Sequence, residues 1–179
     1  MGFEWYKILD NDLDIQQGDF ISNCPIVIPP SNLETVEEIE IEVKIIDSII
    51  LSQSCDLVNG KIEIVLVCPH YPLKTFIENL PPDQQSRKAK KRVIDNLKKG
   101  YLPSYHLLNK DDSIDSLKDY QVVDFRNVYG IQFSALTNIV SKLEKRIRLL
   151  PPYREHLSQA FARYFMRVGL PQDIVVEGY

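Results

Sequence analysis

The chain has 179 residues, of which 44% are hydrophobic and 26% are charged, and its formal net charge is −4 at pH 7. This length is typical of one domain whose core can fold without disulfides or metals, so we expect a single domain over residues 1–179. The acidic balance excludes a chain that is basic over its whole surface, and no apolar run reaches the roughly 18 residues of a membrane helix.

The cysteines and the first residues indicate a cellular location. Three cysteines at irregular spacing are an odd number, which favours reduced thiols over a disulfide framework. The N-terminus lacks the basic-then-apolar pattern of a secretory leader. We therefore expect a cytoplasmic protein that does not contact a membrane.

The first 17 residues are a polar lead-in to the first strand. Within them, Asp10, Asp12 and Asp14 alternate with apolar residues. This spacing resembles the start of a calcium loop, but the glycine at its sixth position and the glutamate at its twelfth are missing, so we interpret it as a solvated turn. Residues 18–28 predict a strand that is bent or broken at Pro25.

The next strand is predicted from a strict alternation. Residues 37–45 place apolar side chains on one face and mostly acidic ones on the other, which predicts a half-buried antiparallel strand with a wet face. Asp47 and Ser48 then predict a bulge or a sharp bend.

The stretch around Asn59-Gly60 organises the predicted fold. Apolar, β-branched runs over 45–58 and 61–69 flank this dipeptide. Asn-Gly between such runs is the strongest short-range signal for a hairpin with a two-residue turn. Because both runs are apolar on both faces, we predict that they are central strands, with Val58 opposite Lys61.

The second half of the chain alternates between helices and short strands. Residues 70–101 predict an insertion with a helix over 83–99, and Gly100 stands where a C-cap glycine belongs. Further predictions are strands over 102–108, 120–125 and 128–133, then a short helix and a strand within 134–149, and finally an amphipathic helix over about 151–169.

Together these elements predict an α+β fold. Its centre is a small antiparallel SH3-like β-barrel formed by about 16–69 and 102–150. The inserted basic helix lies in about 70–101. The C-terminal amphipathic helix would cap the barrel or lie across its open edge.

Three segments carry a recognisable strand pattern: Gly18-Asp19-Phe20-Ile21, Ile49-Ile50-Leu51-Ser52 and Val65-Leu66-Val67-Cys68-Pro69. Their order resembles that of the MazF/PemK-type toxins, which are dimeric SH3-like barrels that cleave RNA. The resemblance covers roughly 16–69 and, more loosely, 120–170. It implies a barrel of this type and a homodimer.

The resemblance does not extend to the family's catalytic residues. The family has an arginine before the second strand, where this chain has Asp47 and Ser48. It has a threonine or serine after the proline of the third strand, where this chain has His70. The segment 52–57 is also similar to uncharacterised bacterial proteins with an S/T-Q-x-C-D-L hairpin, a resemblance that implies no activity.

A polar cluster interrupts the first of the predicted central strands. In one interpretation Cys55 is a nucleophile, with His70 or His156 as its base and Gln53 as an oxyanion donor. In the other, Cys55 packs as a small hydrophobic residue, Asp56 bonds backbone amides and Gln53 closes a bulge. We favour the second interpretation, so an enzyme with candidate residues Gln53, Cys55 and Asp56 is the lesser alternative.

Four side chains are of types that bind zinc: Cys24, Cys55, Cys68 and His70. The predicted hairpin register separates Cys55 from Cys68 by about four residues along the ladder, roughly 13 Å at ~3.3 Å per residue, so the two cannot share an ion. We therefore predict no metal site and no other cofactor.

The predicted helix in the insertion carries a dense group of cations. Such side chains can neutralise phosphates, and Tyr101 and Tyr105 nearby could stack on bases. A merely solvated face, an acidic protein partner or the protein's own acidic segment 34–42 across a dimer are the alternatives. The candidate RNA- or DNA-binding residues are Arg87, Lys88, Lys90, Lys91, Arg92, Lys98 and Lys99.

The C-terminal helix is a weaker candidate. Its aromatic stripe predicts core packing, and His156 lies beside that stripe. Arg163 and Arg167 lie off the stripe and could bind phosphate, but an ion pair with Glu155 or Asp173 is the simpler interpretation.

The sequence thus favours a toxin-like barrel that acts as a nucleic-acid-binding or regulatory module without the usual ribonuclease residues. One alternative is a protein-interaction subunit of a bacterial multigene system, of the defence or toxin–antitoxin kind. The other is a cysteine-dependent enzyme at Cys55.

Overall fold

The computed structural model describes residues 3–10, 14–30 and 41–166. Within these ranges the strands are β1 (Tyr6–Asp10), β2 (Asp19–Ile28), β3 (Glu42–Ile50), β4 (Ile64–Pro72), β5 (Tyr105–Leu108), β6 (Gln121–Asp124), β7 (Tyr129–Gln132) and β8 (Lys145–Leu149). The helices are α1 (Ser54–Val58), α2 (Leu73–Glu78), α3 (Arg87–Lys98), α4 (Phe133–Val140) and α5 (Tyr153–Phe165), with short 3-10 helices η1 (Pro82–Gln84) and η2 (Asp115–Leu117).

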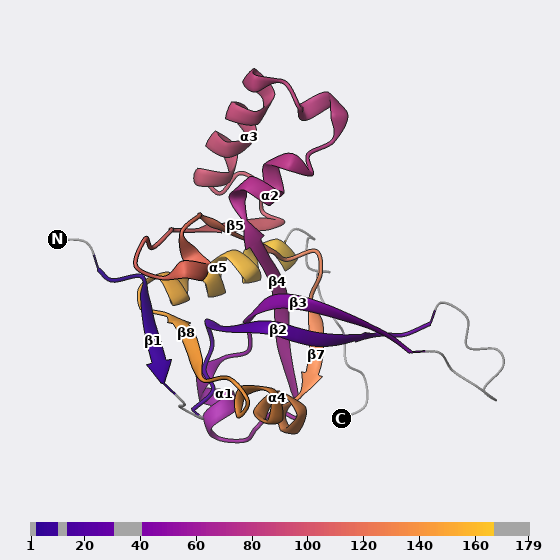
Figure 1. Cartoon of the computed structure of the whole chain (residues 1–179), viewed down its shortest axis with the longest axis vertical. Coiled ribbons are helices and arrows are strands. Elements are labelled where there is room, and N and C mark those ends of the chain that lie inside the picture. The colour runs from indigo at the N-terminus through magenta and orange to yellow at the C-terminus, as the bar shows by residue number, and fades with distance from the viewer. Residues whose placement is uncertain (1–2, 11–13, 31–40, 167–179) are drawn as a thin grey trace, which may run out of the picture.

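The strands form one antiparallel sheet in the order β1–β8–β2–β3–β4–β6–β5 (Figure 1). The first half of β4 also pairs with β7, and its last residues pair with β6. In the described part of the chain no pairing joins β1 to β5, so the sheet is open. The predicted α+β class and the antiparallel sheet are confirmed at this level.

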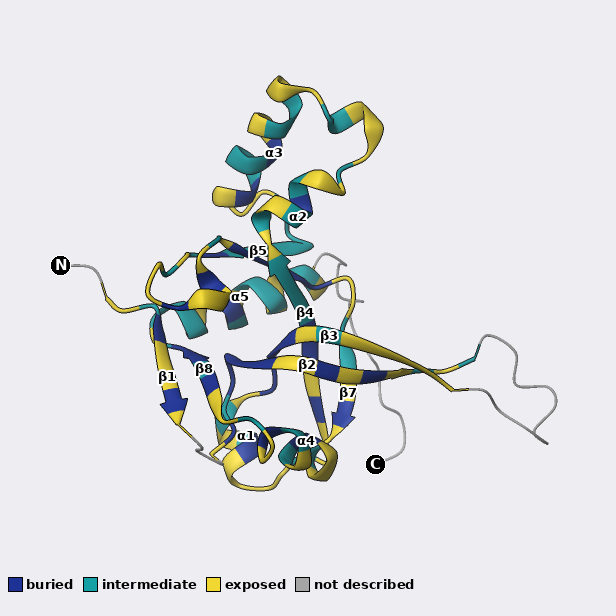
Figure 2. Ribbon diagram, viewed as in Figure 1, coloured by how far each residue is buried: buried dark blue, intermediate teal, exposed yellow. Residues whose placement is uncertain are grey.

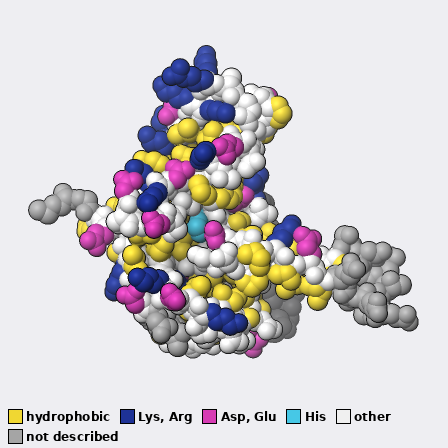
Figure 3. All heavy atoms as spheres, in the orientation of Figure 1, with side chains coloured by type: hydrophobic (Ala, Val, Ile, Leu, Met, Phe, Trp, Pro, Cys, Tyr) yellow, Lys and Arg dark blue, Asp and Glu magenta, His cyan; other side chains and the backbone are white. Residues whose placement is uncertain are grey.

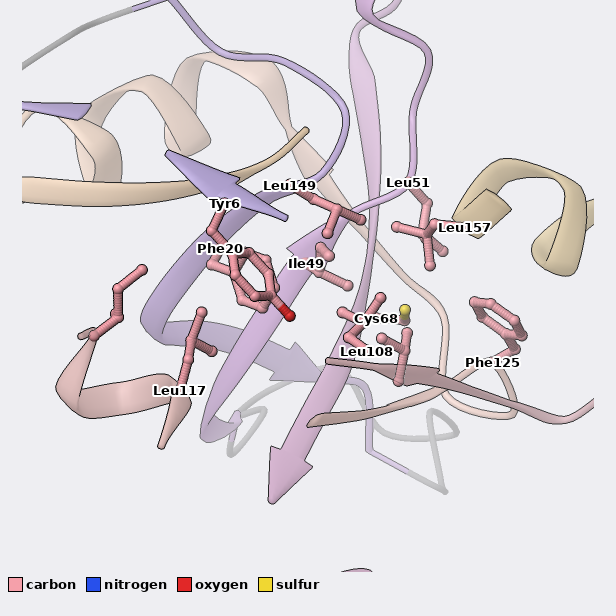
Figure 4. Close-up of a cluster of buried hydrophobic side chains, with 12 residues drawn as sticks. Tyr6, Phe20, Ile49, Leu51, Cys68, Leu108, Leu117, Phe125, Leu149 and Leu157 are labelled. Atoms are coloured by element: carbon pink, nitrogen blue, oxygen red, sulfur yellow. The ribbon is translucent and has the colours of Figure 1, made fainter. Parts of the chain in front are cut away.

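Helices cover both faces of the sheet. Ile49 and Ile50 are consecutive in β3 and therefore point to opposite faces. Ile49 lies in a cluster that Leu157 of α5 completes (Figure 4). Ile50 lies in a second cluster with Leu57 of α1 and Leu136 of α4. Figure 2 shows the buried strands between these helices. The predicted C-terminal helix is confirmed, although its described span is shorter.

The predicted two-residue hairpin at Asn59-Gly60 is wrong. After β3 the chain forms α1, with Asn59 as its C-cap at φ −88°, whereas Gly60 has φ 60°. A type I′ turn needs a positive φ at both residues. A helical turn instead lets Leu57 enter the core, where it is 3% exposed. β3 and β4 are central strands as predicted. The predicted register, with Val58 opposite Lys61, places Cys68 opposite Leu51, whereas Cys68 lies opposite Ile49.

The outer parts of β2 and β3 form a two-stranded ribbon that projects from the sheet (Figure 1). The predicted half-buried strand is wrong here: Ile41, Val43 and Ile45 are 60%, 51% and 60% exposed. The ribbon extends past the helices that cover the rest of the sheet, so its apolar face stays uncovered. Residues 37–40 of the predicted strand lie outside the described residues.

The ladder between β2 and β3 continues through Pro25, where a break was predicted. Its register shifts instead between Ile21 and Cys24, and Asn23 there has a positive φ of 52°. The backbone N–H of Asn23 donates to Asp47 Oδ1 at 2.9 Å. A bulge was predicted at Asp47-Ser48 of β3; the irregularity is instead on the neighbouring strand β2, opposite Asp47.

The N-terminal lead-in contains a strand that we did not predict from the sequence. This strand, β1, pairs with β8 at the edge of the sheet. Beside this edge Asp19 is fully buried. Its carboxylate accepts from Arg146 Nε at 2.9 Å, from Arg148 Nε at 2.5 Å and from the Gln16 N–H at 3.0 Å. Both guanidinium groups also donate to the carbonyl oxygen of Asp14. Asp19, at the start of β2, is thus a structural anchor.

The rest of the predicted aspartate turn is only partly visible. Asp10 forms an exposed ion pair with Lys145 at 3.9 Å. Asp12 lies outside the described residues. No helix in the described ranges is both long and apolar enough to cross a membrane.

The insertion projects from the end of β4 and returns to the sheet at β5 (Figure 1). Phe76 of α2 packs with Val93 and Leu97 of α3 against Val122 of β6. This small core orients the insertion on the sheet. The prediction of a short helix followed by a strand within 134–149 is also confirmed, as α4 and β8.

Candidate nucleic-acid interface

Local sequence fixes both ends of α3. The Ser86 side chain accepts the N–H of Ala89 at 3.2 Å and so caps the first turn. At the other end Gly100 has φ 68°, its N–H donates to the Leu97 carbonyl, and the next N–H reaches the Asn96 carbonyl. This is the Schellman arrangement for which glycine is favoured. The predicted C-cap is confirmed, whereas the helix begins at Arg87 and not at residue 83.

The buried stripe of α3 directs its cations outward. Val93 and Leu97 are 8% and 3% exposed and face the small core of the insertion. The basic side chains lie on the remaining surface of the helix and are exposed, apart from half-buried Lys90. Figure 3 shows Lys and Arg side chains gathered over this end of the molecule. The seven residues predicted from sequence are thus brought together on one projecting element.

These cations are not engaged by the protein's own acids. Among the described residues, none of the seven forms an ion pair within 4.0 Å. Tyr101, beside the helix end, is 70% exposed. Tyr105 is half-buried, and the Arg126 guanidinium lies over its ring at 4.7 Å, so one of its faces is already covered.

A second polar group, at the junction of the insertion and the sheet, was missed by sequence reasoning. Arg126 binds Asp124 with both Nε and Nη2, at 2.9 and 2.7 Å, and Tyr71 donates its hydroxyl to the same carboxylate at 3.2 Å. Burial and then the negative charge of Asp124 raise the pKa of Tyr71. The available signal was an aspartate at the end of a strand that is apolar on both faces.

The polar cluster at 52–56 is a hydrogen-bonded turn and not part of a strand. Ser52 accepts the N–H of Leu66 at 2.8 Å, and Ser54 accepts the N–H of Gln17 at 3.1 Å. The amide of Gln17 donates to the Leu51 carbonyl. The hydroxyls thus tie the lead-in and β4 to the start of α1, which agrees with a structural role.

The prediction that Cys55 packs as a small hydrophobic residue is wrong, because its thiol is exposed while Cys24 and Cys68 are buried. Cys55 Sγ lies 3.7 Å from Asp56 Oδ1. Gln53 is the exposed N-cap of α1 and makes no cap hydrogen bond with its side chain. Of the described cavities, none is lined by Gln53, Cys55 or Asp56.

The four zinc-type side chains are dispersed. Cys24 belongs to the cluster under α1 and α4, Cys68 to the cluster under α5, and Cys55 to the surface. Over residues 3–10, 14–30 and 41–166 there is no group of three or more His, Cys, Asp or Glu side chains placed to hold a metal ion.

Asp47, His70 and Gln121 line one cavity of about 330 Å³. His70 Nδ1 lies 3.0 Å from Gln121 Oε1. Burial lowers the pKa of His70, against the opposing effects of Gln121 and Asp47. None of the described residues that line this cavity is a Lys or an Arg, so they offer no permanent cation to a phosphate.

On α5 the predicted ion pair of Glu155 is formed by Arg154, with Nη2 at 2.9 Å, and not by Arg163. Arg163 and His156 are exposed and line the same cavity as the end of α3. Arg167 and Asp173 lie outside the described residues.

Comparison with models of known protein families and a search of curated proteins find no match for this chain.

Proposed function

We propose that this protein is a nucleic-acid-binding module that contacts RNA or DNA through α3. One observation carries the proposal, namely the segregation of charge. Residues 73–101 hold eight of the 21 Lys and Arg residues but three of the 25 Asp and Glu residues, so this segment carries +5 and the remainder carries −9. A basic projection on an acidic body directs a polyanion to the projection and repels it elsewhere.

The arrangement of α3 supports a phosphate-binding role over a solvated face. Surface cations on a helix commonly pair with acids three or four residues away. Here Asp95 lies four residues from both Lys91 and Lys99, yet neither ion pair forms within 4.0 Å in the described structure. Cations that form no ion pair with the described residues can each approach a phosphate without first breaking such a pair.

The proposal includes kinship with the MazF/PemK-type toxins and their SH3-like barrel. The antiparallel pairing of β2 with β3 and of β3 with β4, the strands that carry the three similar segments, supports this kinship. Asp47 and His70 replace the family's arginine and hydroxyl, so the proposed role is binding or regulation without the usual RNA cleavage. Three free thiols agree with the cytoplasm as the proposed location.

A gel-shift experiment tests the proposal with single-stranded and double-stranded RNA and DNA. The triple substitution Lys90→Ala, Lys91→Ala and Arg92→Ala removes adjacent cations from α3 and should weaken binding at least about tenfold. Removal of Lys118, Lys142 and Lys145 changes the net charge equally but away from α3, and should leave binding almost unchanged. Absence of binding by the parent, or equal losses in both triple variants, would rule the proposal out.

The alternative role in protein interaction is favoured by the β2–β3 ribbon. Val27 pairs with Val43 and Pro25 with Ile45, and their exposed side chains give one apolar face. Within the described residues, 24–28 and 42–46 pair only with each other, so both outer edges of the ribbon are available for pairing with a second copy of the chain. We propose that copy as its occupant.

Analytical ultracentrifugation tests whether the β2–β3 ribbon mediates a homodimer. Val43→Lys should convert a dimer to a monomer, because it places a charge on the apolar face. Lys44→Ala, on the opposite face of the same strand, should leave the dimer intact. A parent protein that stays monomeric at all concentrations, or a dimer that tolerates Val43→Lys, refutes this role.

A further inference from the structure

A cavity of about 470 Å³ lies where the end of α3, β5 and α5 meet. It is distinct from the cavity of Asp47 and His70, and of the seven candidate α3 residues only Lys98 and Lys99 line it. Its volume falls within the range of sites for small ligands. Three elements from distant parts of the sequence build it, so its shape depends on the folded state.

The lining of this cavity is one-sided in charge. Its lining includes Lys98 and Lys99 at the end of α3, Arg163 of α5, and the histidines His106 of β5 and His156 of α5. Neither an Asp nor a Glu of the described residues lines it. Among the described residues Lys98, Lys99 and Arg163 form no ion pair. A concave site with free cations and no acid selects an anion.

Aromatic side chains complete the wall. Trp5 stacks on Tyr153 with ring centroids 3.5 Å apart and planes 9° apart, which holds the indole in place at the cavity. Tyr120 lines the cavity as well. Flat π-surfaces beside cations suit a ligand that joins a planar ring to an anionic group.

His106 adds a neutral polar group to the lining of the cavity. Burial and then the positive charge of His156 lower its pKa to about 4. At neutral pH its imidazole therefore carries one donor and one acceptor and no charge. It can hydrogen-bond a ligand, while the lysines and Arg163 supply the charge that neutralises it.

We propose that this cavity binds a nucleotide phosphate monoester, with Lys98, Lys99 and Arg163 on the phosphate and the base beside the aromatic wall. Two sources share this chemistry: a free mononucleotide, and the phosphorylated end of a strand bound along α3. The second source rests on the proposed nucleic-acid function, whereas the first does not.

The protein carries its own reporter for the test, because Trp5 is the single tryptophan of the chain and lines the cavity. Tryptophan emission is followed while uridine 5′-monophosphate or adenosine 5′-monophosphate is added. Saturable quenching is expected. The parent nucleosides, which lack the phosphate, should give at most about a tenth of the affinity, since the charged contacts are lost.

Variants distinguish mononucleotide binding in this cavity from nucleic-acid binding by the other α3 cations. Arg163→Ala should weaken mononucleotide binding about tenfold, and Lys98→Ala with Lys99→Ala should weaken it further. Lys88→Ala with Lys91→Ala removes α3 cations that do not line the cavity and should leave mononucleotide binding unchanged. Circular dichroism checks that each variant is folded, and Arg163→Lys, which keeps the charge, should recover part of the affinity.

The two sources are distinguished with one oligonucleotide, prepared with a 5′-phosphate, a 3′-phosphate or hydroxyl ends. If a phosphorylated oligonucleotide binds more tightly than the hydroxyl-ended one, and the Arg163→Ala variant loses this difference, the cavity binds the phosphorylated ends of strands. Mononucleotide binding without that preference assigns it to the free ligand. If no mononucleotide quenches Trp5 and no terminal phosphate improves binding, the proposal is overturned, even where gel shifts show that α3 binds strands.

Discussion

Replacing Asp19 should destabilise the protein far more than replacing any exposed acid. The Asp19 carboxylate is fully buried and accepts hydrogen bonds from two guanidinium groups and one backbone amide. Asp19→Ala leaves Arg146 and Arg148 buried, at 4% and 8% exposure, without the Asp19 carboxylate, although Arg148 Nη1 keeps an ion pair with Asp14 Oδ2 at 3.5 Å. Loss of one partner from a buried ion pair costs about 3–5 kcal/mol, a large share of the roughly 5–15 kcal/mol that holds a domain folded.

Urea unfolding followed by Trp5 emission measures this effect. With a slope of about 2 kcal/mol per molar urea, a loss of about 4 kcal/mol lowers the midpoint by about 2 M. Asp10→Ala is the matched control, because Asp10 also pairs with a β8 cation but its side chain is 78% exposed. The control should lose no more than about 0.5 kcal/mol.

A second variant isolates the cause. Replacing Asp19, Arg146 and Arg148 together by apolar residues of similar size should recover much of the loss, because no charge then remains buried. The reasoning is refuted if Asp19→Ala and Asp10→Ala shift the midpoint equally. It is also refuted if the triple replacement is less stable than Asp19→Ala alone.

Three further predictions concern single residues. A thiol reagent should label Cys55 at once and the two buried cysteines only on unfolding, as mass spectrometry would show; equal rates for all three would contradict the structure. Because the pKa of His106 is about 4 when folded and 6.5 is its ordinary value, the unfolded chain binds more protons between these values. Stability should therefore fall as pH drops through that window, and His106→Gln should flatten the fall in urea midpoints. Gly130→Ala places a Cβ 2.7 Å from Ile64 Cγ2 at an exposed position, so it should cost up to about 1 kcal/mol in the same assay, and Ile64→Ala should relieve it.

Features with a strong local signal were predicted from the sequence. The C-cap at Gly100, the cationic helix before it and the amphipathic α5 each depend on residues a few positions apart. Short-range periodicity and backbone preference are sufficient for these elements. The seven basic candidates were likewise visible as a run, and the fold only had to place them on one projection.

Features that depend on contacts between residues far apart in the sequence could not be predicted from the local sequence. Asn59-Gly60 favours a hairpin, but burial of Leu57 under the sheet outweighs that preference and forms α1. The alternation at 41–45 separates two faces of a strand without telling whether any layer covers them. Asp19 and Arg146 are 127 residues apart, so their pairing has no signature in either segment.

In the candidate site, too, the local sequence predicts some features, while others depend on contacts between distant residues. Asp124, Arg126 and Tyr71 meet at the junction only because β4 and β6 are neighbours. Arg163 reaches the end of α3 only because α5 packs back across the sheet. A single sequence gives the charges of these residues but not their neighbours.

The salt dependence of nucleic-acid affinity tests the central claim most directly. For the parent, the logarithm of the association constant should fall linearly with the logarithm of salt concentration, because each phosphate contact releases counterions. The variant Lys90→Ala, Lys91→Ala, Arg92→Ala should have a slope shallower by about two to three, at roughly 0.7–0.9 per lost contact. The variant lacking Lys118, Lys142 and Lys145 should keep the parent's slope. If the α3 variant has the same slope and affinity as the parent, α3 is not the interface.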